Sequence, residues 1–77
     1  MKHKLLDCVV LVKNLPKFGL RAGDLGTIVA IYEPDGLEIE FAKASGGTQA
    51  VLTLPETGVR PIKTDDIISV RSLSLKA

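Results

Sequence analysis

The segment that most constrains the fold spans residues 37–41, Leu-Glu-Ile-Glu-Phe, in which apolar and acidic residues alternate at every position. Successive side chains of a β-strand point to opposite faces of a sheet, whereas those of a helix repeat about every 3.6 residues. The alternation therefore predicts a strand with its three apolar side chains in a core and its two glutamates facing water. A lone strand is not stable, so the rest of the chain must supply partners for it.

Four further runs of mostly apolar residues have the length and the β-branched content of strands. They cover residues 7–12, 26–32, 48–54 and 59–62. The breaker residues between the runs predict a long loop, two turns and a single 3-10 turn, at residues 14–23, 33–36, 44–47 and 55–58 in that order. Five short strands with a long loop after the first predict an all-β fold, a small SH3-like barrel of five to six short strands.

The C-terminal residues 63–77 are predicted to extend beyond a core of about residues 5–62, all within one domain of residues 1–77. Residues 65–75 follow neither strand nor helical spacing, yet they include large apolar side chains, namely Ile67, Ile68, Val70, Leu73 and Leu75. Such a segment is too apolar for a solvated tail. We expect it either to add a sixth strand at the edge of the barrel or to pack on a partner, a homodimer through this segment being one form of the second case.

The chain has 77 residues, enough for one small core and too few for a catalytic domain beside a binding domain. Cys8 is the single cysteine, so no intramolecular disulfide can form, and we expect a protein of the reducing cytoplasm. The apolar run behind the N-terminal Met-Lys-His-Lys is interrupted by Asp7 and is followed by no small-residue cleavage site. We therefore expect neither a signal peptide nor a membrane-spanning segment.

The formal net charge of +1 at pH 7 argues against a strongly electrostatic nucleic-acid binder, because such binding neutralises many phosphates with clustered bases. The charges are unevenly spread. Bases prevail in residues 1–21, whereas the charged residues of 24–40 are all acidic. The two blocks would form a dipole if the fold kept them apart and would neutralise each other if their strands paired. We expect the pairing.

A Gly-Asp-Leu-Gly turn at residues 23–26 precedes the second predicted strand. Gly23 and Gly26 suit a sharp corner, because a Cβ would obstruct a positive φ angle or a close approach of the backbone. Asp24 is placed to accept backbone N–H bonds within the turn. A phosphate-binding loop would need a following helix or a Lys-Ser/Thr pair, but residues 27–32 are strand-like. We interpret the turn as structural.

The stretch Gly-Asp-Leu-Gly-Thr-Ile-Val, residues 23–29, resembles the corner of KOW-type SH3-like modules. A wider combination of motifs is similar to the small bacterial proteins of domain of unknown function family 4926. It comprises Leu6-Asp7-Cys8-Val9-Val10, Leu15-Pro16, Gly19-Leu20, residues 23–29, Tyr32, Glu38-Ile39-Glu40-Phe41 and Leu52-Thr53-Leu54-Pro55. This resemblance covers about residues 5–62 and implies a compact SH3-like barrel in a bacterial cytoplasm, with no implied activity. The turn at residues 44–47 and the apolar C-terminus are individual to this chain.

No constellation of catalytic or metal-binding residues stands out in the sequence. His3, the sole histidine, is expected to fray with the terminus, and Cys8 is expected to be a small apolar filler of its strand. Glu38 and Glu40 would lie about 7 Å apart on one strand face, within the range that glycosidase carboxylates use, but alternating acids on a solvated face are far commoner. We expect no enzyme activity, no cofactor and no metal site.

The remaining candidate for function is a surface in the long first loop, formed by Lys13, Lys17, Phe18 and Arg21. An exposed aromatic ring among bases can stack on a nucleobase or cap a peptide, whereas the alternative is that Phe18 packs under its own loop. The sequence favours a non-enzymatic protein-interaction module or accessory subunit, such as an antitoxin- or immunity-like partner of a neighbouring gene product. Its partner, another protein, would bind this loop or add a strand at the barrel edge. The alternative is a KOW-like RNA- or ribosome-associated module that uses the same four residues.

Overall fold

The computed structural model describes residues 3–73, which form five strands and two 3-10 turns. The strands are β1 (Cys8–Leu11), β2 (Leu25–Tyr32), β3 (Gly36–Ala42), β4 (Thr48–Pro55) and β5 (Val59–Pro61). The 3-10 turns are η1 (Pro16–Phe18), inside the long first loop, and η2 (Glu56–Gly58), where the sequence predicts one. The all-β prediction is confirmed, and each strand lies close to its predicted position.

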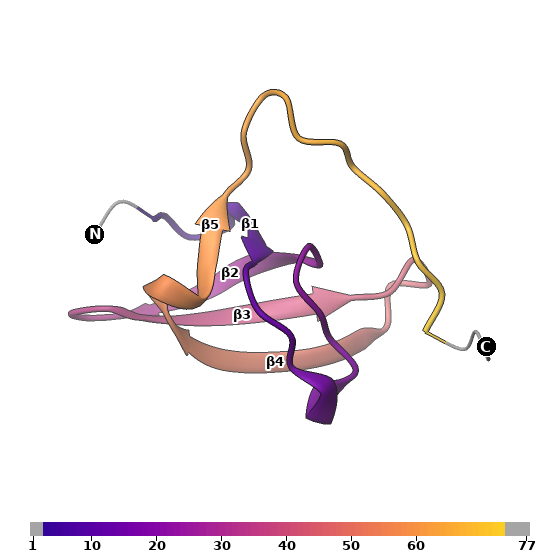
Figure 1. The fold of residues 1–77 in the computed structure, drawn as a ribbon. Coiled ribbons are helices and arrows are strands. Elements are labelled where there is room, and N and C mark those ends of the chain that lie inside the picture. The colour runs from indigo at the N-terminus through magenta and orange to yellow at the C-terminus, as the bar shows by residue number, and fades with distance from the viewer. Residues whose placement is uncertain (1–2, 74–77) are drawn as a thin grey trace.

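All five strands belong to one antiparallel sheet with the order β4-β3-β2-β1-β5. In Figure 1, β3 and β4 run across the view while β5 stands steeply to them. The sheet is not closed, since β4 and β5 form its two edges and do not pair with each other within the described residues. The first loop is tied to β4 through Gln49, and residues 68–73 lie beside that loop and the turn between β3 and β4.

A single hydrophobic core follows the predicted alternation of β3, whose three apolar side chains are all buried. Burying an aliphatic side chain of this size contributes about 1.5–3 kcal/mol, so this cluster supplies most of the stability of the sheet. Apolar side chains of β4 lie at its margin and are only partly buried. The buried members of the core cluster are Val9, Leu11, Leu20, Ile28, Leu37, Ile39, Phe41 and Val59.

The strands that carry the basic and acidic blocks pair as expected, β1 with β2, but among the described residues this pairing does not bring their charged side chains into ion pairs. Glu38 instead accepts a hydrogen bond from the hydroxyl of Tyr32 at 2.6 Å, and Glu40 accepts one from the hydroxyl of Thr48 at 2.7 Å. No described ion pair joins the two blocks. The reason lies in the register, because β1 pairs with residues 25–27 of β2, between the acids, and the bases lie in loops outside β1.

The two glycines of the Gly-Asp-Leu-Gly corner have different roles. Gly23 has a φ angle of +98°, which L side chains rarely adopt, and a Cβ there would meet open space. Gly26 lies over the core, where a Cβ would collide with the side chain of Ile39 and approach Cε1 of Phe41 to 2.9 Å. The first glycine therefore permits the backbone to turn, and the second permits β2 to approach β3.

Of the two alternatives for the C-terminal residues, a sixth strand is not found within the described part of the chain. After β5 the chain loops away from the sheet and returns past the turn between β3 and β4, as the orange-to-yellow trace in Figure 1 shows. No alternation of apolar residues specifies a strand register there, and hydrogen-bonded side chains hold the segment instead. Leu75, one of the apolar residues noted in the sequence, lies outside the described residues.

Candidate functional site

The four residues selected from the sequence, Lys13, Lys17, Phe18 and Arg21, all lie in the loop between β1 and β2 and are exposed. Phe18 ends η1 and leaves 41% of its surface exposed, so it is only partly covered by its own loop. Its carbonyl accepts a hydrogen bond from Nε2 of Gln49 in β4 at 3.0 Å, which ties the loop to the sheet. The three bases form no ion pair within the described part of the chain. The loop thus presents one aromatic ring among unpaired bases.

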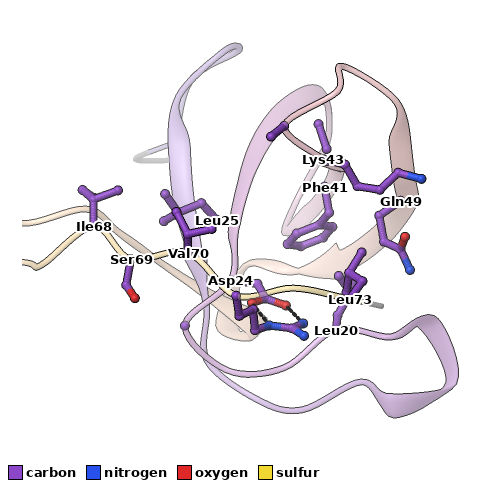
Figure 2. A pocket seen from close by; sticks show the side chains of 14 residues that line it. Leu20, Asp24, Leu25, Phe41, Lys43, Gln49, Ile68, Ser69, Val70 and Leu73 are labelled. Atoms are coloured by element: carbon purple, nitrogen blue, oxygen red, sulfur yellow. Dashed lines mark hydrogen bonds and ion pairs between the residues drawn. The ribbon is translucent and has the colours of Figure 1, made fainter. Parts of the chain in front are cut away.

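A second polar site lies at the end of the same loop, where the side chain of Arg71 meets Asp24. The Arg71 guanidinium donates from Nε to Oδ1 of Asp24 at 2.9 Å and from Nη2 to Oδ2 at 2.6 Å, shown by the dashed lines in Figure 2. Nη2 also donates to the carbonyl oxygen of Gly19 at 2.9 Å. Two parallel hydrogen bonds between a guanidinium and a carboxylate are the strongest common ion-pair geometry. We call the Asp24 carboxylate and the Gly19 carbonyl the guanidinium seat.

Asp24 is therefore more than the turn residue that the sequence predicts. Its Oδ2 does accept a backbone N–H within the turn, that of Arg21 three residues earlier, at 2.8 Å. The same carboxylate also holds a residue from the far end of the described chain. One side chain thus joins the corner before β2 to the C-terminal segment.

We call residues 66–73 the C-terminal strap, because they pass the β3–β4 turn and form one wall of a cavity of about 720 Å³. Figure 2 shows the strap passing beside Asp24, with the other walls formed by the first loop and by the β3–β4 hairpin. The cavity remains between strap and sheet, so the strap spans this space without filling it. The apolar residues that line it are Leu20, Leu25, Phe41, Ile68, Val70 and Leu73.

A second ion pair fixes the other end of the strap. Arg60 in β5 donates from Nη1 and Nη2 to the two carboxylate oxygens of Asp66, at 2.9 and 3.0 Å. Within residues 62–73, Asp66 and Arg71 are the two residues that are not exposed. The strap is therefore attached mainly at two charged points.

Both carboxylates of these ion pairs are held in the charged form. The hydrogen bonds from Arg71 lower the pKa of Asp24, against a smaller opposing effect of burial. The hydrogen bonds from Arg60 lower the pKa of Asp66 to about 2. Both attachments therefore persist at neutral pH.

The edge strand β4 is the second surface of interest. Its eight residues, Thr-Gln-Ala-Val-Leu-Thr-Leu-Pro, include no charged side chain, and proline occurs only at the end. Proteins usually protect edge strands with charges, proline, bulges or covering segments, because unpaired backbone groups invite another strand. The bulge in the β3–β4 pairing lies at the Thr48 end of the strand. Residues 50–54 therefore form a regular, uncharged edge.

Two other residues considered from the sequence lie in surroundings that we did not expect. His3 is buried, at 5% exposure, beside η2 and β5, so the expectation that it frays is wrong. Cys8 is exposed on β1 and is not the core filler that we expected. The described residues contain no group of three or more His, Cys, Asp or Glu side chains placed to hold a metal ion, and no helix of theirs is long and apolar enough to cross a membrane.

Sequence reasoning missed Arg71 and did not single out the edge of β4. Arg71 is a single charged residue among apolar and small residues, and this pattern is a weak indication of a specific role. Nothing in the sequence indicates that its partner is Asp24. The absence of charge from residues 48–55 is also readable, but only the strand order places this segment at an edge.

The strands, the corner and the surfaces define a small all-β protein with one open antiparallel sheet. The family model for a domain of unknown function (DUF4926) matches residues 5–61, and the chain belongs to that family. No match was found among curated proteins, and none among solved structures.

Proposed function

We propose that this protein is a non-enzymatic protein-interaction module or accessory subunit of the bacterial cytoplasm, and that its partner protein adds a strand to the edge of β4. The observation that carries the proposal is the regular, uncharged edge at residues 50–54. In strand addition the backbone of the edge supplies the affinity, and alternate side chains supply the selectivity. An antitoxin- or immunity-like role would be one case of such a module.

The margin of the core supports this assignment. Leu52 and Leu54 point toward the core but are only partly buried, because no strand of residues 3–73 lies beyond β4 to cover them. Val51, on the opposite face, is 47% exposed. A strand added next to β4 would cover apolar surface on both faces, and this burial favours binding.

The topology supports the SH3-like assignment within this proposal. The five short strands, the long loop after β1 and the 3-10 turn before β5 are the features that the sequence led us to expect for such a barrel. The exposed, unpaired Cys8 supports a reducing compartment.

The test is a tagged pull-down from the native cell at near-physiological salt, with and without nuclease, read by mass spectrometry. The variant Val51→Lys places a charge on the free edge, and Val29→Lys is its matched control, since Val29 is 38% exposed but lies on the interior strand β2. We expect one protein to remain bound after nuclease treatment, to be lost with Val51→Lys and to be retained with Val29→Lys. Equal retention by both variants would contradict binding at β4.

The KOW-like RNA-associated module is the second candidate, and the observation that favours it is the group of unpaired bases around Phe18. Under that alternative, the bound material would be lost on nuclease treatment and with rising salt. The double change Lys17→Glu and Arg21→Glu would abolish binding, whereas Val51→Lys would not.

A further inference from the structure

We propose that the C-terminal strap is exchanged between two copies of the chain, so that Arg71 of one copy occupies the guanidinium seat of the other. This goes beyond the proposed function, because the occupant is a second copy and the site is the cavity under the strap instead of the edge of β4. A segment that is exchanged in this way makes the same contacts in the pair as in the single chain.

The way the strap is attached permits such an exchange. The ion pairs Arg60–Asp66 and Arg71–Asp24 attach it, and residues 67–70, which we call the hinge, are exposed between these two ion pairs. A change of backbone direction in the hinge would lead the chain to a neighbouring copy. Both ion pairs would then be preserved, the first within one copy and the second between copies.

The hinge also carries apolar surface that the single chain leaves in water. Ile67 is 91% exposed and Val70 is 92% exposed, although both are large aliphatic residues. In an exchanged pair the two hinges cross from one copy to the other near the twofold axis, where these side chains can cover each other. Contiguous exposed apolar groups of this kind mark interaction surfaces, and their burial would offset part of the association entropy.

The guanidinium seat can bind Arg71 of a second copy in the same way as it binds Arg71 of its own chain. The bidentate geometry and the Gly19 carbonyl specify a guanidinium, and the strap of another copy presents the same one. The cavity of about 720 Å³ under the strap shows that the strap is not packed tightly into place. Because the tether gives the chain's own strap a high effective concentration, we expect exchange to increase with protein concentration.

The first arm of the experiment measures the oligomeric state of the full chain by sedimentation velocity and native mass spectrometry. We expect the dimer fraction of the wild type to rise with concentration and to be lost in Arg71→Ala, while Val51→Lys, the β4 variant, keeps the dimer. Arg71 lies outside the hydrophobic core cluster, so we expect Arg71→Ala to leave the sheet folded. A wild type that remains monomeric up to about 1 mM, the effective concentration of a short tether, would overturn the proposal, as would a dimer that survives Arg71→Ala.

The second arm uses charge reversal to distinguish an Asp24–Arg71 ion pair within one chain from the same ion pair between two chains. Asp24→Arg and Arg71→Asp each destroy the ion pair within one chain, but an equimolar mixture restores both pairs across two chains. We expect a one-to-one heterodimer in this mixture and none when Arg71→Asp is replaced by Lys17→Asp, which makes the same charge change on the first loop. The double variant Asp24→Arg with Arg71→Asp can form an ion pair of reversed charge but not the hydrogen bonds to Gly19 and from Arg21, so it should recover part of the wild-type dimer. Failure of the folded variants to form the heterodimer would overturn the proposal, and if Asp24→Arg does not fold, the Arg71→Ala arm decides.

Loss of the dimer in Arg71→Ala, with the pulled-down partner retained, would support exchange independently of the β4 proposal. Loss of the partner in Val51→Lys, with no dimer at any concentration, would support the proposed function and overturn exchange.

Discussion

The sheet of residues 8–61 and the strap of residues 66–73 are held by different forces. The sheet is stabilised by buried aliphatic and aromatic side chains from four of its strands, and several of these side chains have no exposed surface. The strap buries little apolar surface and is fixed by two bidentate ion pairs. Ion pairs near the surface contribute far less than a packed core, so the sheet should be stable and the strap should open readily.

The largest expected effect is in the centre of the core. Ile39, in β3, has no exposed surface, and Ile39→Ala should lower the free energy of unfolding by about 2–5 kcal/mol through lost burial and the cavity left behind. Denaturant unfolding followed by circular dichroism measures this. Val51→Ala, on the exposed face of β4, is the control and should change stability by less than about 1 kcal/mol. Similar losses of unfolding free energy in Ile39→Ala and Val51→Ala would contradict the distinction between core and surface.

A smaller effect is expected at the corner before β2. Gly26→Ala should destabilise by about 1–3 kcal/mol, because the new Cβ has to displace Ile39 and the ring of Phe41. Gly23→Ala meets no atom and should cost only the strain of its positive φ angle, about 1–2 kcal/mol. Chemical-shift changes should reach the Phe41 ring in the first variant and stay within the turn in the second.

A still smaller effect on stability is expected for the strap. Arg71→Gln should change the free energy of unfolding by less than about 1 kcal/mol, yet it should increase hydrogen exchange and shift amide signals in residues 19–24 and 66–73. Signals of β3 should not move. Lys17→Gln is the control, since it removes a positive charge that forms no described ion pair. A large loss of global stability in Arg71→Gln would mean that the strap is part of the core structure.

The smallest effect is expected for the pH dependence of the strap's attachment, which should change only at acidic pH. The pKa of Asp24 lies below its ordinary value of 3.8 in the folded protein, so the attachment is complete above that value and is lost as the pH falls through the folded-state pKa. Carboxyl carbon shifts recorded by NMR between neutral pH and pH 2 measure it. Arg71→Gln should raise the pKa of Asp24 and leave that of Asp66, about 2, unchanged. An unchanged Asp24 titration would show that Arg71 does not hold it.

Much of the sheet could be predicted because its signals are local. The alternation in residues 37–41 and the breakers between the apolar runs follow from the geometry of one strand and one turn, and the structure reproduces them. The exposure of Cys8 and the burial of His3 were not predictable in this way, because burial depends on segments that approach from elsewhere in the chain. The same limit explains why the sequence did not connect Arg71 with Asp24.

The sequence by itself determined the strands, the 3-10 turn before β5 and the turn at Gly23, since each depends on residues that are neighbours along the chain. The requirement for Gly26 depends instead on Ile39 and Phe41 of β3, which only the tertiary structure brings against it. Only the tertiary structure decided that β4 is an uncharged edge, that Arg71 enters the seat formed by Asp24 and Gly19, and that the hinge remains in water. The physical reason is that pairing order and ion-pair choice depend on contacts between distant segments. Alternation fixes which face of a strand is buried, but it does not specify which segments meet.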